Sequence, residues 1–182
     1  MPLPEAYLNG DQFGLPASCK VHRLANIATD KLHCGEHCRI DAFVTITGDV
    51  RLGAAVHLGT GCGIWGGYGV RIGTGTSISP GAKIFSATED VGSELTSNPQ
   101  LPGRAFKWGK VRIGAFCVIG SGTVLLPGSV IGHEVVIGAL SLVKGDIDID
   151  SGGVYAGSPV RFIKHRTPVN RLLSLGEDVI GA

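Results

Sequence analysis

The chain contains 182 residues, the size of a single domain, with a formal net charge of +1 and only 17% charged residues. This balanced charge argues against a nucleic-acid-binding surface, which needs clustered Lys and Arg to neutralise phosphates. No apolar run approaches the ~20 residues of a membrane span, and residues 1–5 lack the basic and apolar regions of a signal peptide. We therefore expect a cytoplasmic, single-domain protein with reduced cysteines.

Residues 1–26 show no repeat and are expected to form an irregular cap over one end of the fold. From residue 27 to about residue 150, aliphatic side chains recur at intervals of six. Neither a helix nor an isolated strand gives this period. A hexapeptide period is typical of an all-β parallel β-helix, in which three hexads form one triangular coil. The six-spaced positions are Cys34, Ile40, Ile46, Leu52, Leu58 and Ile64, then Ile72, Ile78 and Ile84, then Ile113, Ile119, Leu125, Ile131, Ile137 and Val143.

A second inward position lies four residues after the aliphatic one and carries small side chains. Four of the five cysteines occupy inward positions of the repeat, so we interpret them as buried small side chains. The spacing within residues 33–38, which hold two His and two Cys, matches no known zinc pattern, and no metal is expected. The small inward positions are Cys38, Val44, Val50, Val56, Cys62, Thr76, Ala82, Cys117, Thr123, Ser129, Val135 and Ser141.

The repeat is interrupted twice, and interruptions in a solenoid usually map to a functional face. Eight residues separate Ile64 from Ile72, so two residues are inserted within 65–69. A long loop over residues 85–110 then leaves the prism and returns before Ile113. Because Ile64 and Ile84 stack one coil apart, both breaks should fall at the same corner. The bulge either makes room for the loop or contributes to a functional site.

The repeat fades after Val143, and residues 151–182 form a C-terminal tail. We expect a turn over residues 155–159 and a short amphipathic helix from about residue 169 to 175. This tail can cap the open end of the solenoid, which every solenoid needs.

Several motifs resemble one family. The chain carries Ile40-Asp41-Ala42-Phe43, Val56-His57-Leu58, a loop from Ser86 to Pro99, "GALSLVKGD" over 138–146 and "VYAGSPVRFIKHR" over 154–166. Together with the hexads they resemble the hexapeptide-repeat acyltransferases, a left-handed β-helix group that includes galactoside and maltose acetyltransferases. The closer resemblance is to sugar O-acetyltransferases of surface-polysaccharide (lipopolysaccharide or capsule) clusters, and it covers roughly residues 27–166.

The resemblance implies a homotrimer with active sites between subunits and acetyl-CoA as co-substrate, its pantetheine arm lying along the C-terminal coils. Basic residues of the tail would meet the CoA phosphates; otherwise they form a solvated tail. Carried over to this sequence, the cofactor-binding residues would be Gly138, Ala139, Ser141, Gly157, Ser158, Pro159, Arg161 and Lys164.

The catalytic base is where the chain departs from the family. Galactoside-type enzymes carry a loop histidine, whereas this chain reads Thr88-Glu89-Asp90. Our first candidate is His57, which precedes Leu58 and should point outward, with Glu89 or Asp90 orienting it across a subunit boundary. The alternatives are a structural interface histidine and His133 as the base.

Four residues are candidates for binding the acceptor. Asp41 would supply a carboxylate or stabilise a corner of the prism. Trp65 and Tyr68 would stack on a sugar or nucleotide ring or pack in the trimer. Asn98 would contact sugar hydroxyls.

The leading hypothesis is an acetyl-CoA-dependent sugar O-acetyltransferase, in which a base removes the hydroxyl proton and a backbone N–H stabilises the oxyanion. N-acetylation of a (nucleotide-linked) amino sugar is the alternative, because an amine needs less help from a base. A γ-carbonic-anhydrase-like protein would need three converging histidines, and a catalytically inactive trimeric scaffold would have lost its base.

Overall fold

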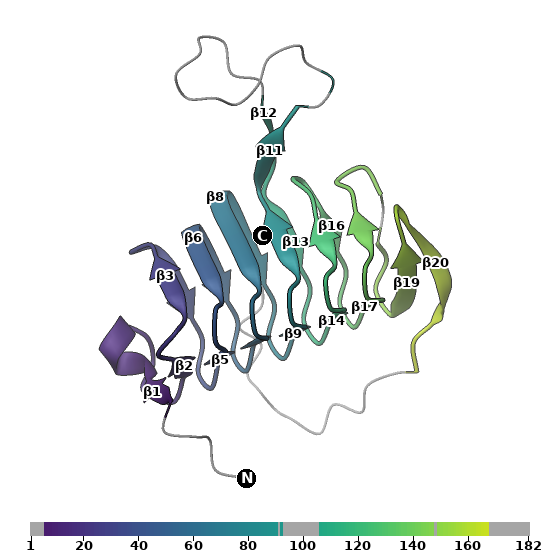
Figure 1. The fold of residues 1–182 in the computed structure, drawn as a ribbon. Helices are drawn as coiled ribbons and strands as arrows, with labels where there is room; N and C mark the ends of the chain where they lie inside the picture. The colour runs from purple at the N-terminus through teal and green to yellow at the C-terminus, as the bar shows by residue number, and fades with distance from the viewer. Residues whose placement is uncertain (1–5, 91, 93–105, 148, 168–182) are drawn as a thin grey trace.

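The chain folds as a stack of triangular coils along one axis (Figure 1). This computed structural model describes residues 6–90, 92, 106–147 and 149–167. Strands of successive coils pair in parallel with their aliphatic residues in register, as in Ile64↔Ile84 and Ile119↔Ile137. The all-β fold class is thereby confirmed, and the stack is consistent with a left-handed hexapeptide-repeat β-helix. No helix within the described residues is long and apolar enough to cross a membrane.

The coils form three faces. Face 1 contains β2 (Lys20–His22), β5 (Arg39–Ile40), β7 (His57–Leu58), β9 (Ser77–Ile78), β14 (Val118–Ile119), β17 (Val136–Ile137) and β19 (Gly153–Gly157). Face 2 contains β3 (Asn26–Ala28), β10 (Lys83–Phe85), β15 (Val124–Leu125) and β18 (Leu142–Val143). Face 3 contains β4 (Leu32–Cys34), β13 (Val111–Ile113) and β16 (Val130–Ile131). Two long strands, β6 (Thr45–Leu52) and β8 (Gly63–Ile72), bend around a corner and belong to both face 2 and face 3.

The core of the prism matches the hexad register. All twelve small inward positions expected from the sequence are at most 3% exposed. Burial raises the pKa of the Cys62 and Cys117 thiols to about 11, so both are protonated at neutral pH. They donate to the backbone carbonyls of Ser79 and Gly132, respectively. These cysteines therefore pack as small core residues, as the register predicted.

The N-terminal segment is more regular than the irregular cap expected over residues 1–26. β1 (Tyr7–Asn9) runs antiparallel to β2, and a short 3-10 helix (Gly10–Phe13) lies between them. β2 already pairs in parallel with β5. Coil-like pairing therefore begins before residue 27, and a hairpin strand covers its outer edge.

The two interruptions of the repeat lie at one corner, as predicted. β8 carries the bulge, and the long loop leaves as an antiparallel hairpin of β11 (Ala87–Glu89) and β12 (Phe106–Trp108), which rises above the prism in Figure 1. The buried Ser86 hydroxyl donates to the Trp65 carbonyl at 2.8 Å and accepts from the Tyr68 amide at 2.9 Å. The bulge and the root of the loop are thus one hydrogen-bonded unit.

The C-terminal end closes with a second hairpin. β19 extends face 1, and β20 (Val160–His165) returns antiparallel to it. The turn expected over residues 155–159 is confined to Ser158 and Pro159, because residues 153–157 are a strand. The expected helix at residues 169–175 lies outside the described residues.

Candidate active site

His57 and Asp41 form a polar pair on the outer surface of the prism. The hexad register turns Leu58 inward and therefore His57 outward, and the His57 side chain is 40% exposed. Its Nε2 lies 2.9 Å from Oδ2 of Asp41, whose residue is only 7% exposed. An exposed imidazole held from behind by a buried carboxylate is an arrangement suited to proton transfer.

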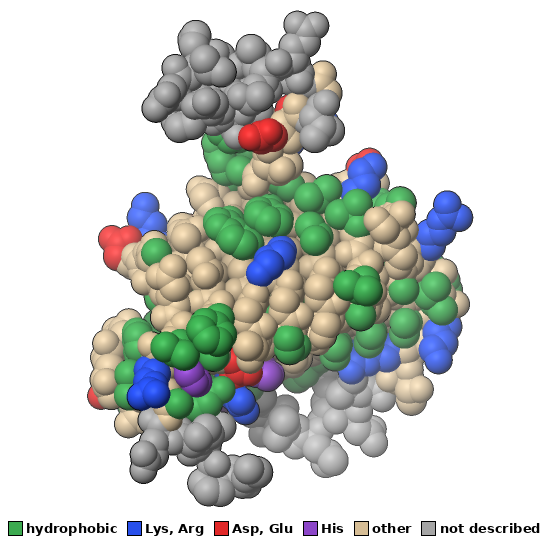
Figure 2. All heavy atoms as spheres, viewed as in Figure 1, with side chains coloured by type: hydrophobic (Ala, Val, Ile, Leu, Met, Phe, Trp, Pro, Cys, Tyr) green, Lys and Arg blue, Asp and Glu red, His purple; other side chains and the backbone are tan. Residues whose placement is uncertain are grey.

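Asp41 receives hydrogen bonds from two further side chains. The Arg39 Nε donates to Oδ1 at 2.7 Å, and the Tyr7 hydroxyl donates to the same oxygen. Burial alone would raise the pKa of Asp41, but the hydrogen bonds from Tyr7, His57 and Arg39 together hold it below its usual value. Histidine and acidic side chains accordingly lie together at the N-terminal end of the molecule in Figure 2.

Glu89 and Asp90, expected to orient His57, lie elsewhere in this chain. Both belong to the loop hairpin that leaves face 2, whereas His57 lies on face 1. Asp90 forms an ion pair with Lys107 at 3.1 Å, and hydrogen bonds from the Gly92 amide and Lys107 lower its pKa. Within one chain the partner of His57 is therefore Asp41, which we had considered only as a substrate ligand or a corner residue.

The aromatic candidates form stacked pairs at the base of the loop. Trp65 stacks on Phe85, with ring centroids 4.6 Å apart. Tyr68 stacks on Trp108 at 5.3 Å, and these two rings remain half-exposed or more. Trp65 is thus engaged in packing, whereas the Tyr68–Trp108 pair presents open aromatic surface. Asn98 lies outside the described residues.

A hollow of about 790 Å³ lies beside the Tyr68–Trp108 pair, between the loop hairpin and the C-terminal coils. Apolar side chains, including Trp108 and Leu126, line it together with Lys107 and Lys144. Each lysine is paired with an aspartate, Asp90 or Asp146. The hollow is therefore mixed in character rather than strongly basic.

The two turns expected to line the CoA arm meet at one corner of the prism. The buried Ser141 hydroxyl accepts a hydrogen bond from the Gly157 amide at 3.1 Å. A Cβ added to Gly138 would lie 2.9 Å from the Ala156 Cβ, so the Ala156 side chain leaves no room for a side chain at residue 138. Turn residues Ala139, Ser158 and Pro159 flank this contact. The structure thus places six of the predicted cofactor residues side by side.

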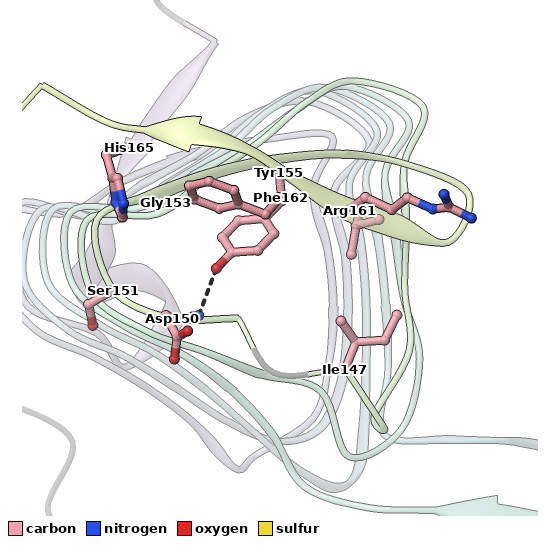
Figure 3. A pocket seen from close by; sticks show the side chains of 9 residues that line it. Ile147, Asp150, Ser151, Gly153, Tyr155, Arg161, Phe162 and His165 are labelled. Carbon is pink, nitrogen blue, oxygen red and sulfur yellow. Dashed lines mark hydrogen bonds between the residues drawn. The ribbon is translucent and has the colours of Figure 1, made fainter.

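The basic residues of the tail lie at the C-terminal end. Arg161 and Lys164 are exposed on β20, and Arg161 points away from the centre of an end-on pocket of about 440 Å³ (Figure 3). Tyr155 points into that pocket, and its hydroxyl accepts from the Asp150 amide at 3.1 Å. Arg166 instead donates to the Phe116 carbonyl at 2.7 Å. Arg161 and Lys164 therefore offer charge to solvent, whereas Arg166 has a structural contact.

The remaining histidine and metal hypotheses find less support. His133 accepts from the Ala115 amide through Nδ1, at 3.1 Å, so a backbone contact uses that ring nitrogen. Within the described part of the chain, no group of three or more His, Cys, Asp and Glu side chains could hold a metal ion.

Tyr7 and Arg39 are the contacts that sequence reasoning missed. Arg39 could have been found, because it lies 18 residues before His57 and one rung away on the same face. Tyr7 carried no signal, since it precedes the repeat and reaches Asp41 only through the β1–β2 hairpin.

Comparison with known families gives one match and several relatives. The model for bacterial transferase hexapeptide (six repeats) matches residues 110–145. A dTDP-4-amino-4,6-dideoxy-D-glucose acyltransferase of Escherichia coli is 30% identical over 151 residues, which are 80% of this chain and 77% of the relative. WbbJ of Escherichia coli, whose name assigns it to O-acetyl transfer in lipopolysaccharide biosynthesis, is 35% identical over 89 residues, or 46% of this chain and 44% of that protein.

A solved structure extends the similarity to three dimensions. AntD, an N-acyltransferase from Bacillus cereus in complex with dTDP and 3-hydroxybutyryl-CoA, superposes with a TM-score of 0.83 at 26% identity. The match covers 89% of this chain and 90% of AntD. The chain therefore belongs to the bacterial hexapeptide-repeat transferase family, and it is an acyltransferase.

Proposed function

We propose that the protein transfers an acyl group from an acyl-CoA to the amino group of a nucleotide-linked amino sugar. The exposed His57, held by the buried Asp41, supplies the base for such a transfer. The relative that matches 80% of the chain is named for an amino-sugar acceptor linked to dTDP. The relative named for O-acetyl transfer matches 46%. Amine acylation, the alternative in the sequence analysis, is thus the better supported reaction.

His57 would act as the general base. The sugar amine attacks the thioester carbonyl, a C–N bond forms, and the C–S bond breaks. His57 takes the proton that the nitrogen loses and returns it to the departing CoA sulfur, so that an amide and a free thiol result. The ionised Asp41 stabilises the imidazolium that forms in between.

The acyl-CoA would lie along the corner where residues 138–141 meet residues 157–159. The hydrogen bond between Ser141 and Gly157 fixes these turns relative to each other. Exposed Arg161 and Lys164 lie just beyond them and suit the CoA phosphates. We retain acetyl-CoA as the expected donor, while longer acyl groups belong in the test.

The active unit would be a homotrimer with sites between subunits. Leu24, Phe43 and Leu140 are 49%, 62% and 81% exposed. All three lie at the corner between faces 1 and 2, where turn amides bond to the preceding coil (Phe43 to Leu24, Leu140 to Ser121). We call this line the apolar edge. Neighbouring subunits would cover this edge, since exposed apolar patches mark protein–protein contacts.

The test is turnover with matched acceptors. Purified protein receives acetyl-CoA or 3-hydroxybutyryl-CoA with dTDP-4-amino-4,6-dideoxyglucose, or with dTDP-6-deoxyglucose, which carries a hydroxyl at the same position. Thiol release is followed spectrophotometrically, and the product is identified by mass spectrometry. We expect an amide product and a kcat at least ~100-fold lower in His57→Asn, since general bases contribute about 10²–10⁴-fold. The control His37→Asn alters an exposed histidine with a positive φ, which Asn tolerates.

Sugar O-acetylation is the second candidate, and the His57–Asp41 pair is the observation that favours it. A hydroxyl needs a base more than an amine does, so this pair would be essential for it. Ester product from the hydroxyl acceptor alone would establish this reaction and overturn ours. No acyl transfer to either acceptor, with no CoA binding in calorimetry, would leave the trimeric scaffold.

A further inference from the structure

The N-terminal hairpin brings a tyrosine to the back of the His57–Asp41 pair. β1 pairs with β2 so that Tyr7 lies opposite His22, and the two rings meet edge-on at 5.0 Å. The Arg39 guanidinium lies over the Tyr7 ring, 5.0 Å from its centroid. Tyr7 is therefore held by ring contacts as well as by its hydroxyl group.

Tyr7, Arg39 and Asp41 form a closed ring of hydrogen bonds. Arg39 donates through Nε to Asp41 Oδ1 and through a terminal nitrogen to the Tyr7 hydroxyl, at 3.0 Å, and that hydroxyl donates to Oδ1. Oδ2 is left to His57. Rotation of the carboxylate, otherwise a soft torsion, would break both bonds to Oδ1 at once.

We propose that Tyr7 and Arg39 are positioning residues that lock the Asp41 carboxylate so that His57 carries its proton on Nε2 and acts as a base through Nδ1. This proposal rests on the acyl-transfer function proposed above. An ionised carboxylate only accepts, so the imidazole nitrogen facing it must donate, and in the neutral ring the other nitrogen then holds the lone pair. The wrong tautomer costs about 10⁴ in kcat in a serine protease triad.

The kinetic test compares Tyr7→Phe and Arg39→Lys with two matched controls. Tyr155→Phe removes a buried tyrosine hydroxyl elsewhere, and Arg51→Lys alters an exposed arginine of face 3. We expect kcat to fall about tenfold in both test variants, the lower end of the loss when a hydrogen-bond partner behind a ligating histidine is removed. KM for acyl-CoA should stay unchanged, and Arg39→Met should lose more than Arg39→Lys. Equal kcat in test and control variants would overturn the proposal.

A second measurement needs no turnover, so failure of the proposed function would not affect it. Nitrogen-15 NMR of labelled imidazoles, with His57→Asn to assign the signal, reports which ring nitrogen of His57 carries the proton. We expect the Nε2–H tautomer in the wild type and a mixture in Tyr7→Phe and Arg39→Lys. These variants should remain folded, which thermal unfolding checks. Identical tautomer populations in wild type and in folded variants would refute the positioning role.

Discussion

Asp41 is the residue whose interpretation the structure changes most. Its sequence position allowed either a substrate ligand or a corner residue. In the structure its oxygens accept from Tyr7 and Arg39 and face His57. Little of the carboxylate remains for an acceptor sugar, so we propose that Asp41 supports the histidine rather than the sugar.

Asp41→Asn should separate catalysis from cofactor binding. An amide can donate as well as accept, so it can hold His57 in the wrong tautomer. We expect kcat to fall at least ~100-fold, within the range for loss of a general base, while acetyl-CoA affinity measured by calorimetry is unchanged. Asp30→Asn, at an exposed position, is the control. An equally large loss of CoA affinity would contradict the assigned role.

At the scale of elements, side-chain pairs tie neighbouring coils together. Asp49 of β6 accepts two hydrogen bonds from Arg71 of β8, at 2.7 and 3.1 Å. These bonds lower the pKa of Asp49, despite an opposing contribution from burial. A carboxyl with a lowered folded-state pKa stabilises the fold above its ordinary pKa, and the contribution is lost as the pH falls through the folded-state value.

Asp49→Asn should therefore destabilise the protein at neutral pH but not in strong acid. Because the pair is partly exposed, we expect a loss of about 1 kcal/mol or less at pH 7. The difference from wild type should shrink as the pH falls below the ordinary value of 3.8. Urea unfolding at a series of pH values measures it; a constant difference would show that charge is not the cause.

Ser86 is the link between the bulge and the loop root. Ser86→Ala would leave the Tyr68 amide without its partner, whereas the Trp65 carbonyl would keep the hydrogen bond from the backbone amide of residue 86. An unsatisfied buried polar group costs about 1–3 kcal/mol, so we expect a loss of that size in chemical denaturation. Thr60→Ala, at an exposed corner, should change little. Equal stability of the two variants would mean that the Ser86 side chain does not stabilise the contact between the bulge and the root of the loop.

At the scale of elements, the hexad register alone predicted several features of the structure. It identified the buried small residues, the outward direction of His57 and the shared corner of the two breaks. A repeat specifies which side chains face inward, but it holds no information about segments outside it. The β1–β2 hairpin, and with it the Tyr7 contact, could not be predicted, nor could the β11–β12 hairpin. Asp41 lies at a corner of the prism. There the rotamer of its side chain, and not the period of the repeat, brings its carboxylate to His57.

At the scale of the whole molecule, the corner between faces 1 and 2 exposes Leu24 and Phe43 towards the N-terminal end and Leu140 towards the C-terminal end. Phe43 and Leu140 of the apolar edge have φ values of 59° and 54°. This left-handed conformation costs a non-glycine residue roughly 1–2 kcal/mol. Bulky side chains at such positions are readily explained if a neighbouring subunit covers them.

Replacing Leu24 and Phe43 by serine should therefore weaken the assembly. We expect light scattering after size exclusion to give three times the 18.8 kDa chain mass for the wild type and a lower mass for the double variant. Val130→Ser, which alters an exposed residue on face 3, should keep the wild-type mass. A monomeric wild type would refute the proposed trimer.

The stack of coils also sets the distance between His57 and the proposed cofactor corner. Face 1 carries His57 on β7 and ends β17 beside Gly138. Three strand-to-strand steps separate these two strands: β7 to β9, β9 to β14, and β14 to β17. At the usual strand spacing, these three steps span about 14 Å. The distance between the proposed base and the proposed cofactor corner is therefore set by a whole number of coils.

Duplicating residues 118–135 would insert one coil and lengthen this distance by about 5 Å. Each coil contacts only its neighbours, so the longer protein should fold. It should bind acetyl-CoA in calorimetry with unchanged affinity yet lose turnover; unchanged turnover would show that this spacing is irrelevant. In such an enzyme the distance between the base and the bound acyl donor can change only by the height of whole coils.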